Sequence, residues 1–410
     1  MDAQAQPVVV LKFGGSSLAT PERVRLVARR IADRRRTGEA VVAVVSAQGD
    51  TTDDLLRRLR ELAPDPPARE VDMLLATGEQ QSAALVAATL GAMGVPAVSL
   101  TGWQAGIATD RSHRKARIHG IAPDQVRRHL ADGAVVVVAG FQGVSETGDV
   151  TTLGRGGSDL TAVALAASLG APCEICSDVD GVYTADPRVV PDAQRLDEIG
   201  SDEMIELAAL GAQVLQGRAV EFAWQHGVTI LARSTFSDQQ GTRVLPRPGT
   251  ERPSAVTGVA LESSVARVLC EHLPDRPGVA AHLFGALAEK GVNVDVIVQS
   301  PSHEGTTDIA FTVAEDDAAQ AEEVARRAVG ELGGGHVSRD ADVAKVSAVG
   351  AGMLSRPGVA SRAFRALADE GVNIIAISTS EIKISCLVRR EDAAKGLRAL
   401  HRAFELHRRP

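Results

Sequence analysis

Short apolar segments rich in β-branched residues alternate with helical patterns between residues 7 and 233 of the chain. The segments read PVVVLKF, AVVAVVSA, VPAVSL, AVVVVAGF, CEICSDV and VTILAR. Alternation of this kind is typical of a mainly parallel β-sheet that is covered by helices on both faces. The pattern therefore predicts an α/β fold for this part of the chain.

A helical pattern over residues 23–36, RVRLVARRIADRRR, is the most basic stretch of the chain. Helical spacing places Val24, Val27, Ala28 and Ile31 on one face and the arginines on the other. We interpret the run as the solvated face of a packed helix rather than a binding patch. The formal net charge of the whole chain is −8, which disfavours a nucleic acid or an anionic membrane as partner.

Glycine and acidic clusters follow several of the predicted strands, namely KFGGSS, SAQGDTTDD, GFQG and SDVDGVY. Ligands of parallel sheets bind at the carboxyl ends of the strands. Lys12 stands at such an end, directly before Gly14 and Gly15, where it could hold a phosphoryl group while backbone N–H groups cradle the oxygens. An exposed lysine at a strand end is the alternative, and the P-loop motif is absent.

The segment LGRGGSDLTAVALAA, at residues 153–167, combines glycines with two opposite charges. Its glycines allow a sharp turn, and we expect Ser158 to cap the helix that follows. Asp159 could orient Lys12, and Arg155 could grip a substrate carboxylate. The alternative is a turn that only caps a buried helix.

Glu79, in LLATGEQQSAAL, could bind an ammonium group, or it could be a dipole partner in the first turn of a helix. A cationic and an anionic clamp together indicate an amino acid as substrate. In SDVDGVYTADPR, Tyr183 and Arg188 suit the base and the phosphates of a nucleotide.

Residues 237–258 are rich in Pro, Gly and polar residues and predict an interdomain linker. Beyond it, RPGVAAHLFGALAEKGVNVDVIVQS from Arg276 recurs as RPGVASRAFRALADEGVNIIAISTS from Arg356. Each copy predicts a strand, an R-P-G turn, a helix and, after G-V-N, a second strand. The pair could be a dimerisation module, or it could bind a small-molecule effector between the two copies.

Four cysteines in 410 residues, without a signal peptide or a membrane-spanning run, predict a cytoplasmic protein. Cys173 and Cys176 form a C-x-x-C pattern within a predicted strand, where side chains three positions apart face opposite ways. We therefore expect structural cysteines and no metal site.

The motifs KFGGSS, SAQGDTTDD, LLATGEQ, VAGFQG, TTLGRGGSDLTAVALAA and SDVDGVYTADPRVVP, followed by the R-P-G-V and G-V-N repeat, resemble the aspartate kinases of the amino acid kinase superfamily. The resemblance covers nearly the whole chain, with the motifs in family order. It implies an α/β/α sandwich with a mainly parallel sheet, over residues 1–247. It also implies two ferredoxin-like ACT domains, at 248–340 with linker and strand, and at 341–410.

By this resemblance the chain phosphorylates the β-carboxylate of L-aspartate with ATP and Mg²⁺, at the head of the lysine, threonine, methionine and diaminopimelate pathways. Lys12 and Asp159 would be catalytic. The residues that would hold aspartate are Ser46, Thr52, Glu79, Phe141, Arg155 and Ser158. The residues that would hold the nucleotide are Lys12, Gly14, Gly15, Ser177, Asp178, Tyr183, Asp186, Arg188 and Gln213.

The resemblance implies feedback by lysine and threonine, and a homodimer or higher oligomer formed through the ACT domains. On the first repeat, the effector-binding residues would be Asp275, Gly278, Val279, Ala280, Asn293, Val294, Asp295 and Gln299. On the second repeat, they would be Val359, Ala360, Asn373, Ile374, Ser380 and Glu381.

Three positions depart from the family pattern. Gln213 replaces a lysine that would contact the ATP phosphates, whereas Gln48 and Cys176, for methionine and tyrosine, are interpreted as packing changes. Two alternatives therefore stay open. One is a specialised paralogue with relaxed regulation or another amino-acid substrate, and the other is a weakly active amino-acid-sensing regulatory subunit.

Overall fold

The computed structural model describes residues 6–211, 214–246, 254–301 and 305–408, and the chain divides into two compact units. The first unit consists of Met1–Val182, Arg195–Ala208 and Gln213–Thr250. The second consists of Tyr183–Gln194, Ala209–Ala212 and Glu251–Pro410. Two short segments from the middle of the chain therefore belong to the C-terminal unit.

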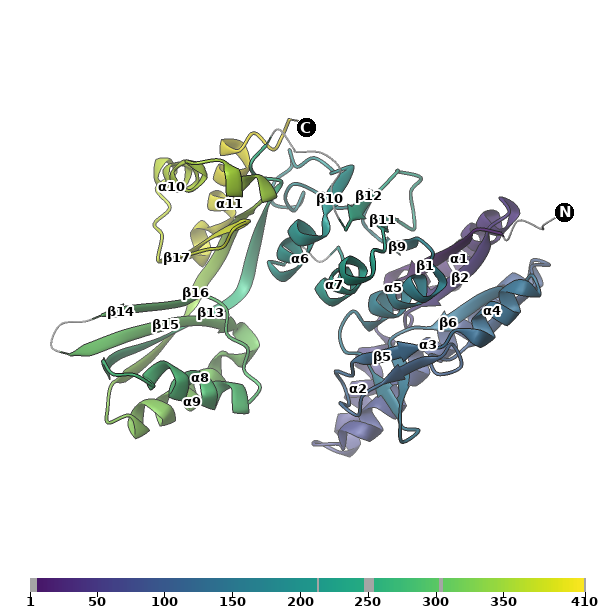
Figure 1. Ribbon diagram of the computed structural model, residues 1–410, viewed down its shortest axis with the longest axis horizontal. Coiled ribbons are helices and arrows are strands. Elements are labelled where there is room, and N and C mark those ends of the chain that lie inside the picture. The colour runs from purple at the N-terminus through teal and green to yellow at the C-terminus, as the bar shows by residue number, and fades with distance from the viewer. Residues whose placement is uncertain (1–5, 212–213, 247–253, 302–304, 409–410) are drawn as a thin grey trace. The chain divides into compact units, whose positions relative to one another are not determined.

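An eight-stranded sheet forms the centre of the first unit (Figure 1). Its strands are β1 (Val8–Phe13), β2 (Ala40–Val45), β3 (Ala97–Leu100), β6 (Val135–Ala139), β9 (Cys173–Ser177), β10 (Glu198–Gly200), β11 (Ile230–Ser234) and β12 (Thr242–Leu245). The order is β10-β12-β11-β9-β1-β2-β6-β3, and the six strands from β11 to β3 are parallel. The predicted mainly parallel sheet is confirmed.

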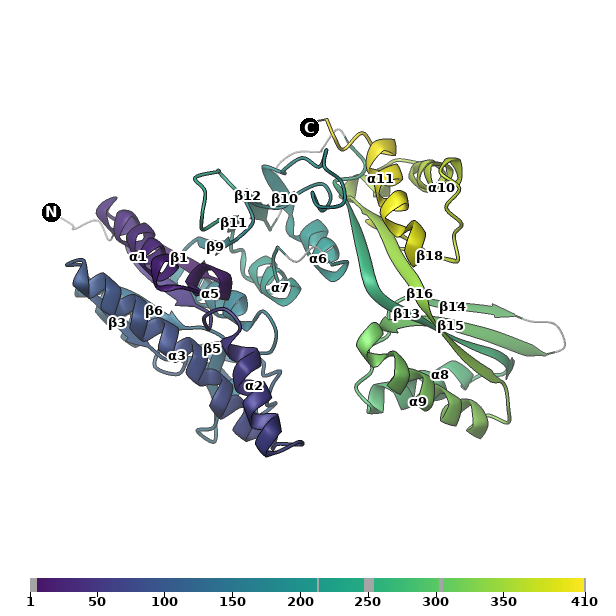
Figure 2. The ribbon, with the colours of Figure 1, turned by 180° about the vertical axis from the view of Figure 1, so that it is seen from behind.

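Helices cover both faces of this sheet, and its central strands β2 and β6 are therefore buried on both sides. The helices of the unit are α1 (Pro21–Arg36), α2 (Thr51–Leu62), α3 (Ala68–Ala92), α4 (Asp124–Ala131), α5 (Gly157–Leu169), α6 (Ser201–Ala209) and α7 (Gly217–His226). Helices α5 and α7 pack together on the face seen in Figure 1, and α1 and α3 on the face seen in Figure 2. Helix α1 buries Val24, Val27, Ala28 and Ile31, as its pattern predicts.

A smaller sheet of four short strands also belongs to the first unit. Its strands are β4 (Ile107–Thr109), β5 (Ile118–Ile121), β7 (Gln142–Ser145) and β8 (Val150–Thr152), in the order β5-β4-β7-β8. Strand β8 packs against α3 and leads directly into the glycine-rich turn before α5. This sheet was not predicted from the sequence.

The second unit contains one antiparallel sheet of six strands. They are β13 (Gly258–Pro274), β14 (Ile297–Pro301), β15 (Thr306–Ala314), β16 (His336–Val349), β17 (Ala376–Thr379) and β18 (Lys383–Arg389), in the order β14-β15-β13-β16-β18-β17. Its helices are α8 (Val279–Glu289), α9 (Ala318–Glu331), α10 (Val359–Asp369) and α11 (Ala393–Ala403).

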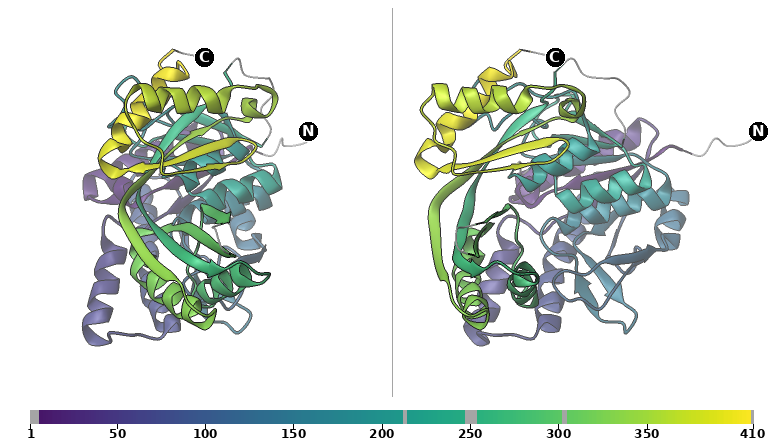
Figure 3. Two further views of the ribbon diagram at one scale, coloured as in Figure 1. Left: turned by 90° about the vertical axis from the view of Figure 1, so that its left-hand side faces the viewer. Right: turned by 60° about the vertical axis from the view of Figure 1, so that its left-hand side comes forward.

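The predicted repeat is visible in matching helix starts. Gly278 and Gly358, each in the left-handed region with φ of 99° and 91°, precede α8 and α10. Each copy has its own apolar core, one under α8 and α9 and the other under α10 and α11. The long strands β13 and β16 run through both halves (Figure 3).

The second unit also includes Tyr183–Gln194, which packs into the core under α10 and α11 through Ala185, Val190 and Ala193. The predicted linker at residues 237–258 is wrong in part. It contains β12, which pairs with β11 and β10 and so belongs to the eight-stranded sheet. Within the described ranges, no helix is both long and apolar enough to cross a membrane.

Candidate functional site

Lys12 and Asp159 form an ion pair at the carboxyl end of β1. Parallel neighbours β2 and β9 flank Lys12 on both sides, and Asp159 lies in the first turn of α5. Lys12 Nζ lies 2.6 Å from Asp159 Oδ1, and the two side chains are only 12% and 10% exposed. The structure thus brings together the two residues that the sequence assigns to catalysis, with the cation held in one place.

The loop after β1 requires glycine for close backbone contact. A Cβ atom on Gly15 would lie 2.6 Å from the carbonyl oxygen of Ala47, at the end of β2, which no side chain could tolerate. A Cβ atom on Gly14 would lie 3.4 Å from Lys12 Nζ. Gly14 therefore leaves open the space beside the ammonium, and Gly15 lets the loop pack against the end of β2.

Glu79 is a buried carboxylate with one unused oxygen. It lies in the middle of α3, so the alternative of a first-turn dipole partner is wrong. Oε1 accepts a hydrogen bond from the N–H of Ala47 at 3.0 Å, whereas Oε2 is buried and has no partner among the described residues. Burial outweighs that hydrogen bond and raises the pKa of Glu79 to about 7. An ammonium group would supply the missing partner.

The glycine turn begins α5 differently from the prediction. Gly154 and Gly156 are left-handed, with φ of 81° and 72°, and Gly156 is the residue that precedes the helix. Ser158 is therefore inside the helix and does not cap it, because left-handed Gly156 turns the chain into the helix one residue earlier. No side chain caps this end, and the N–H groups of Gly157 and Asp159 donate instead to the carbonyl oxygens of Gly154 and Gly156. The positive end of the helix dipole still favours an anion beside this turn.

The other predicted aspartate-binding residues surround this turn or follow β2. Arg155, at the tip of the turn, is exposed and has no ion pair within the described chain. Phe141 has a φ of 69°, which is uncommon for a bulky residue, and its ring would touch a Cβ atom on Gly157. Ser46 follows β2 directly, and Thr52 lies half-buried in the first turn of α2.

The predicted nucleotide residues divide between the two units. Ser177 ends β9, next to the strand of Lys12, and exposed Asp178 follows it. Tyr183, Asp186 and Arg188 belong to the second unit. There Asp186 and Arg188 form an exposed ion pair at 2.7 Å.

Gln213 lies outside the described residues. Of the two other departures, Gln48 donates a hydrogen bond through Nε2 to the carbonyl oxygen of Leu18 at 2.7 Å. Cys176 is buried in the apolar core beneath α1 and α3, which confirms a packing role. All four cysteines are free and buried, and no group of three or more metal-ligating side chains occurs among the residues described.

The predicted effector residues of the two repeats lie near opposite edges of the six-stranded sheet. Gln299 is on edge strand β14, and Ser380 and Glu381 follow edge strand β17. Val279, Ala280, Val359 and Ala360 begin α8 and α10, with Gly278 directly before α8. Asp275 and Asn293 are exposed in the first copy, and Asn373 is exposed in the second. Val294 in the first copy and Ile374 in the second are half-buried.

Asp295 already has a charged partner within the chain. The ammonium of Lys345, on β16, pairs with Asp295 and lies 2.6 Å from Glu262, although Lys345 is only 3% exposed. Burial opposes the charge, but hydrogen bonds and attraction from the two carboxylates outweigh it and raise the pKa of Lys345. The charge of Asp295 is therefore compensated within the chain.

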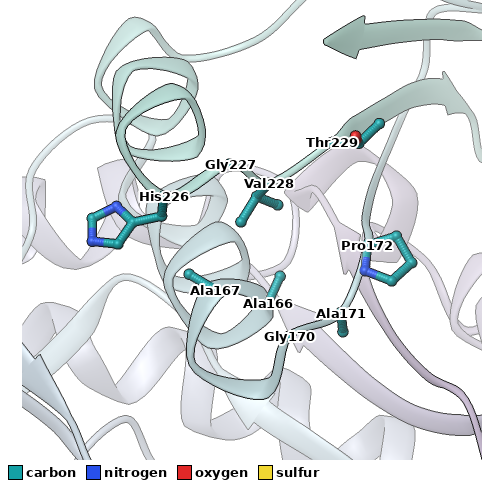
Figure 4. Close-up of a pocket in the computed structure, with 9 residues that line it drawn as sticks. All are labelled: Ala166, Ala167, Gly170, Ala171, Pro172, His226, Gly227, Val228 and Thr229. Carbon is teal, nitrogen blue, oxygen red and sulfur yellow. The ribbon is translucent and has the colours of Figure 1, made fainter. Parts of the chain in front are cut away.

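A cavity of about 300 Å³ lies at the opposite end of the parallel sheet from Lys12 (Figure 4). The ends of α5 and α7 and the residues before β9 and β11 line it, mostly with small apolar side chains. It offers neither a charge pair nor an open helix N-terminus. We therefore do not assign the catalytic site to it.

Comparison with known proteins agrees with this geometry. Residues 7–232 match the amino acid kinase family, and residues 267–329 and 346–404 each match an ACT domain. An aspartokinase of Mycolicibacterium smegmatis is 49% identical, over 97% of this chain and 96% of its own.

Among solved structures, E. coli aspartokinase III in complex with aspartate and ADP is similar, with a TM-score of 0.80 and 26% identity. The match covers 97% of this chain and all of that one. The same enzyme with lysine and aspartate gives a TM-score of 0.76 and 27% identity, over 97% and 99% of the two chains. The chain belongs to the aspartokinases of the amino acid kinase family, and it is an aspartate kinase, a phosphotransferase with two C-terminal ACT domains.

Proposed function

We propose that the site between β1, α3 and α5 transfers the γ-phosphoryl group of ATP to the β-carboxylate of L-aspartate, giving 4-phospho-L-aspartate and ADP. The observation that carries the assignment of roles is the buried carboxylate of Glu79, whose Oε2 lacks a partner within the described chain. A buried carboxylate in this state costs free energy until a cation meets it. The α-ammonium group of aspartate is that cation.

The chemistry needs no general base. The β-carboxylate of aspartate is already ionised at neutral pH, so its oxygen attacks the γ-phosphorus directly while the bond to the ADP oxygen breaks. Catalysis then depends on position and on charge stabilisation. Lys12 supplies a fixed positive charge for the equatorial oxygens, and Asp159 holds the ammonium in that position at 2.6 Å.

Arg155 binds a carboxylate of the substrate, opposite to the ammonium clamp at Glu79. Its exposed guanidinium is free within the described chain to form a bidentate pair. Ser46, Thr52, Phe141 and Ser158 complete the aspartate site. The positive clamp at Arg155 and the negative clamp at Glu79 thus select an amino acid as substrate, and the distance between the two clamps selects the length of that amino acid.

The nucleotide phosphates bind at Gly14, Gly15 and Lys12. The missing Cβ atom of Gly14 leaves room beside the Lys12 ammonium, and Gly15 lets the loop pack against the carbonyl oxygen of Ala47. Ser177 and Asp178, at the end of the neighbouring strand β9, provide further contacts within the same unit. Mg²⁺ usually keeps waters and binds through one or two carboxylates together with substrate phosphates, so a dedicated cluster of ligands is not required. We assign it to ATP rather than to the chain.

The ACT domains bind lysine, threonine or both as feedback inhibitors. One structure of E. coli aspartokinase III is a complex with lysine and aspartate, which supports this assignment. Because β14 and β17 are at opposite edges of one sheet, residues from the first repeat meet those of the second most directly when two chains associate. We therefore propose a homodimer or a higher oligomer. Free, buried cysteines suit the reducing cytoplasm, where we place the enzyme.

The test is ADP release and hydroxamate formation by the purified chain with ATP, Mg²⁺ and L-aspartate. Glutamate and asparagine serve as matched controls, since one changes the length and the other removes the attacking carboxylate. Turnover with aspartate alone supports the proposal. Turnover with another amino acid would indicate the specialised paralogue, and no turnover would indicate a regulatory subunit.

A further inference from the structure

Asp72, in α3, is a fully buried carboxylate that the sequence did not single out. It accepts hydrogen bonds from the N–H of Arg114 at 3.0 Å and from the N–H of Thr152 at 3.1 Å. It also accepts one from Thr152 Oγ1 at 2.5 Å, and it lies 2.8 Å from His113 Nδ1. This single side chain therefore fastens two separate backbone segments to α3.

Both segments support the turn that carries Arg155. Thr152 is the last residue of β8 and comes immediately before the turn. Arg114 is left-handed, with a φ of 68°, and its carbonyl oxygen would lie 3.0 Å from a Cβ atom on Gly154. A left-handed arginine is strained, so the hydrogen bond from its N–H group to Asp72 compensates the cost of this conformation. Without that bond, the Arg114 carbonyl that packs against Gly154 would move.

Arg218, in α7, supports the same turn from another helix. It donates through Nη1 to the carbonyl oxygen of Leu153 at 2.7 Å and through Nη2 to that of Ala116 at 3.2 Å. The turn is thus fixed at consecutive residues, at Thr152 by Asp72 and at Leu153 by Arg218. Arg155, two residues further on, is exposed, so its place depends on this anchored backbone.

Asp72 and Glu79 are seven residues apart on α3, which places them on one face about 10.5 Å apart along the axis. We propose that Asp72 is a positioning residue that ties the Arg155 turn to the helix carrying Glu79, and so sets the distance between the two charge clamps for aspartate. The inference rests on the roles proposed for Glu79 and Arg155. It adds that α3, as one rigid helix, fixes the distance between the two charge clamps and thereby the length of the amino acid that fits between them.

The first test is Asp72→Asn. This change keeps the volume of the side chain but replaces one accepting oxygen by an NH₂ group, which cannot accept the hydrogen bonds that Asp72 receives. We expect KM for aspartate to rise about 10-fold, because a small misplacement of a binding group is costly. KM for ATP should not change, and kcat at saturating aspartate should be largely retained, since Asp72 contacts neither Lys12 nor Asp159 in the described chain. A merely structural role would not separate the two KM values in this way.

The second test combines Asp72→Asn with Arg155→Ala. If Asp72 acts through Arg155, the double variant has the KM for aspartate of Arg155→Ala alone. Effects that multiply, or an unchanged KM in Asp72→Asn, would overturn the inference while leaving Arg155 as a clamp. An unchanged KM in Arg155→Ala alone would instead refute the proposed role of Arg155, so the two failures are distinguishable.

Glu174→Gln is the matched control, because Glu174 is also a buried carboxylate, paired with Arg34 at 2.5 Å and Arg233 at 3.7 Å. It should lower the melting temperature without raising KM for aspartate. If Asp72→Asn does not fold, Thr152→Val removes only the Oγ1 hydrogen bond. We expect a smaller rise in the same KM, and no rise would contradict the inference.

Discussion

The ammonium of Lys12 and the carboxylate of Asp159 meet at 2.6 Å where the carboxyl end of β1 faces the amino end of α5. Helix α5 begins without a side-chain cap, so its positive end and Lys12 act on the same region. Asp159 prevents the lysine from folding away from that region. The pair thus keeps a cation in place before the substrates bind.

Replacing either member of the pair should reduce turnover more than binding. We expect Lys12→Ala and Asp159→Ala each to lower kcat by about 10²-fold or more, because their effect is greatest at the transferring phosphoryl group. Steady-state kinetics with circular dichroism as a folding check would measure this. Near-normal turnover in a folded variant would remove the proposed mechanism.

Glu79 predicts a pH dependence of aspartate binding. Its pKa of about 7 means that protonation of the free enzyme competes with the substrate ammonium below that pH. KM for aspartate should therefore rise by about tenfold for each unit below pH 7, while KM for ATP should not follow it. In Glu79→Gln, KM should be high at every pH. A flat profile in the unmodified chain would exclude an ammonium ligand.

The same residue should limit the stability of the ligand-free protein. The folded pKa of Glu79 lies above the ordinary 4.5, so the folded state binds the extra proton and stability falls as pH rises from 4.5 to about 7. Glu79→Gln should then raise the free energy of unfolding at pH 8 by up to about 3 kcal/mol. At pH 4.5 the gain should vanish. Urea titrations at both pH values decide the matter, and equal gains would contradict the explanation.

Gln213 gives a prediction from the sequence. If an ordinary phosphate site has lost a cation here, Gln213→Lys should raise kcat by about 10-fold or more. Measurement at saturating ATP and aspartate separates this from a change in KM. A rate that stays flat or falls would mean that the phosphates are held differently in this chain.

Asp275 tests the regulatory proposal. Lysine plus threonine at millimolar level should inhibit, and Asp275→Ala should relieve the inhibition without changing kcat, because the residue is exposed and lies in the second unit. Asp369→Ala, at an exposed aspartate outside the effector set, is the control. Binding should be measured by calorimetry on the full chain. Absence of binding would leave the repeats as a dimerisation module.

A fragment of residues 248–410 is unsuitable for that measurement. It lacks Tyr183–Gln194, whose Ala185 and Val190 are buried in the core under α10 and α11. Thr184 also accepts the N–H of Val259 through its carbonyl oxygen at 2.8 Å. The sequence places this segment in the first domain, since the local pattern there is a strand-end loop and shows nothing of a partner far along the chain.

Local patterns predicted the parallel sheet, the repeat and the meeting of Lys12 with Asp159, because each follows from periodicity or from strand ends. They failed where strands are short and mixed in polarity, as in β4 and β12. They also left two interpretations of Glu79 open. The fold decides between them, because α3 begins at Ala68 behind Pro67 and Glu79 therefore lies in the middle of the helix and not in its first turn.

Asp72 shows a further limit. An aspartate seven residues before Glu79 on an apolar helix face was a visible signal, but its partners are 41 to 80 residues away in the chain. A backbone N–H group can donate a hydrogen bond whatever the side chain of its residue. The residues that donate to a buried carboxylate therefore cannot be recognised from their amino-acid types. Only the fold reveals that contact.

The long strands β13 and β16 have an evolutionary consequence. Gly258 pairs with Val349 at one end of the ladder and Glu271 pairs with His336 at the other, so the duplicated halves share a single pair of strands. Neither half can be deleted, exchanged by recombination or moved to another protein without cutting strands of its twin. We therefore expect the two copies to be retained together as one module, with divergence concentrated in their loops.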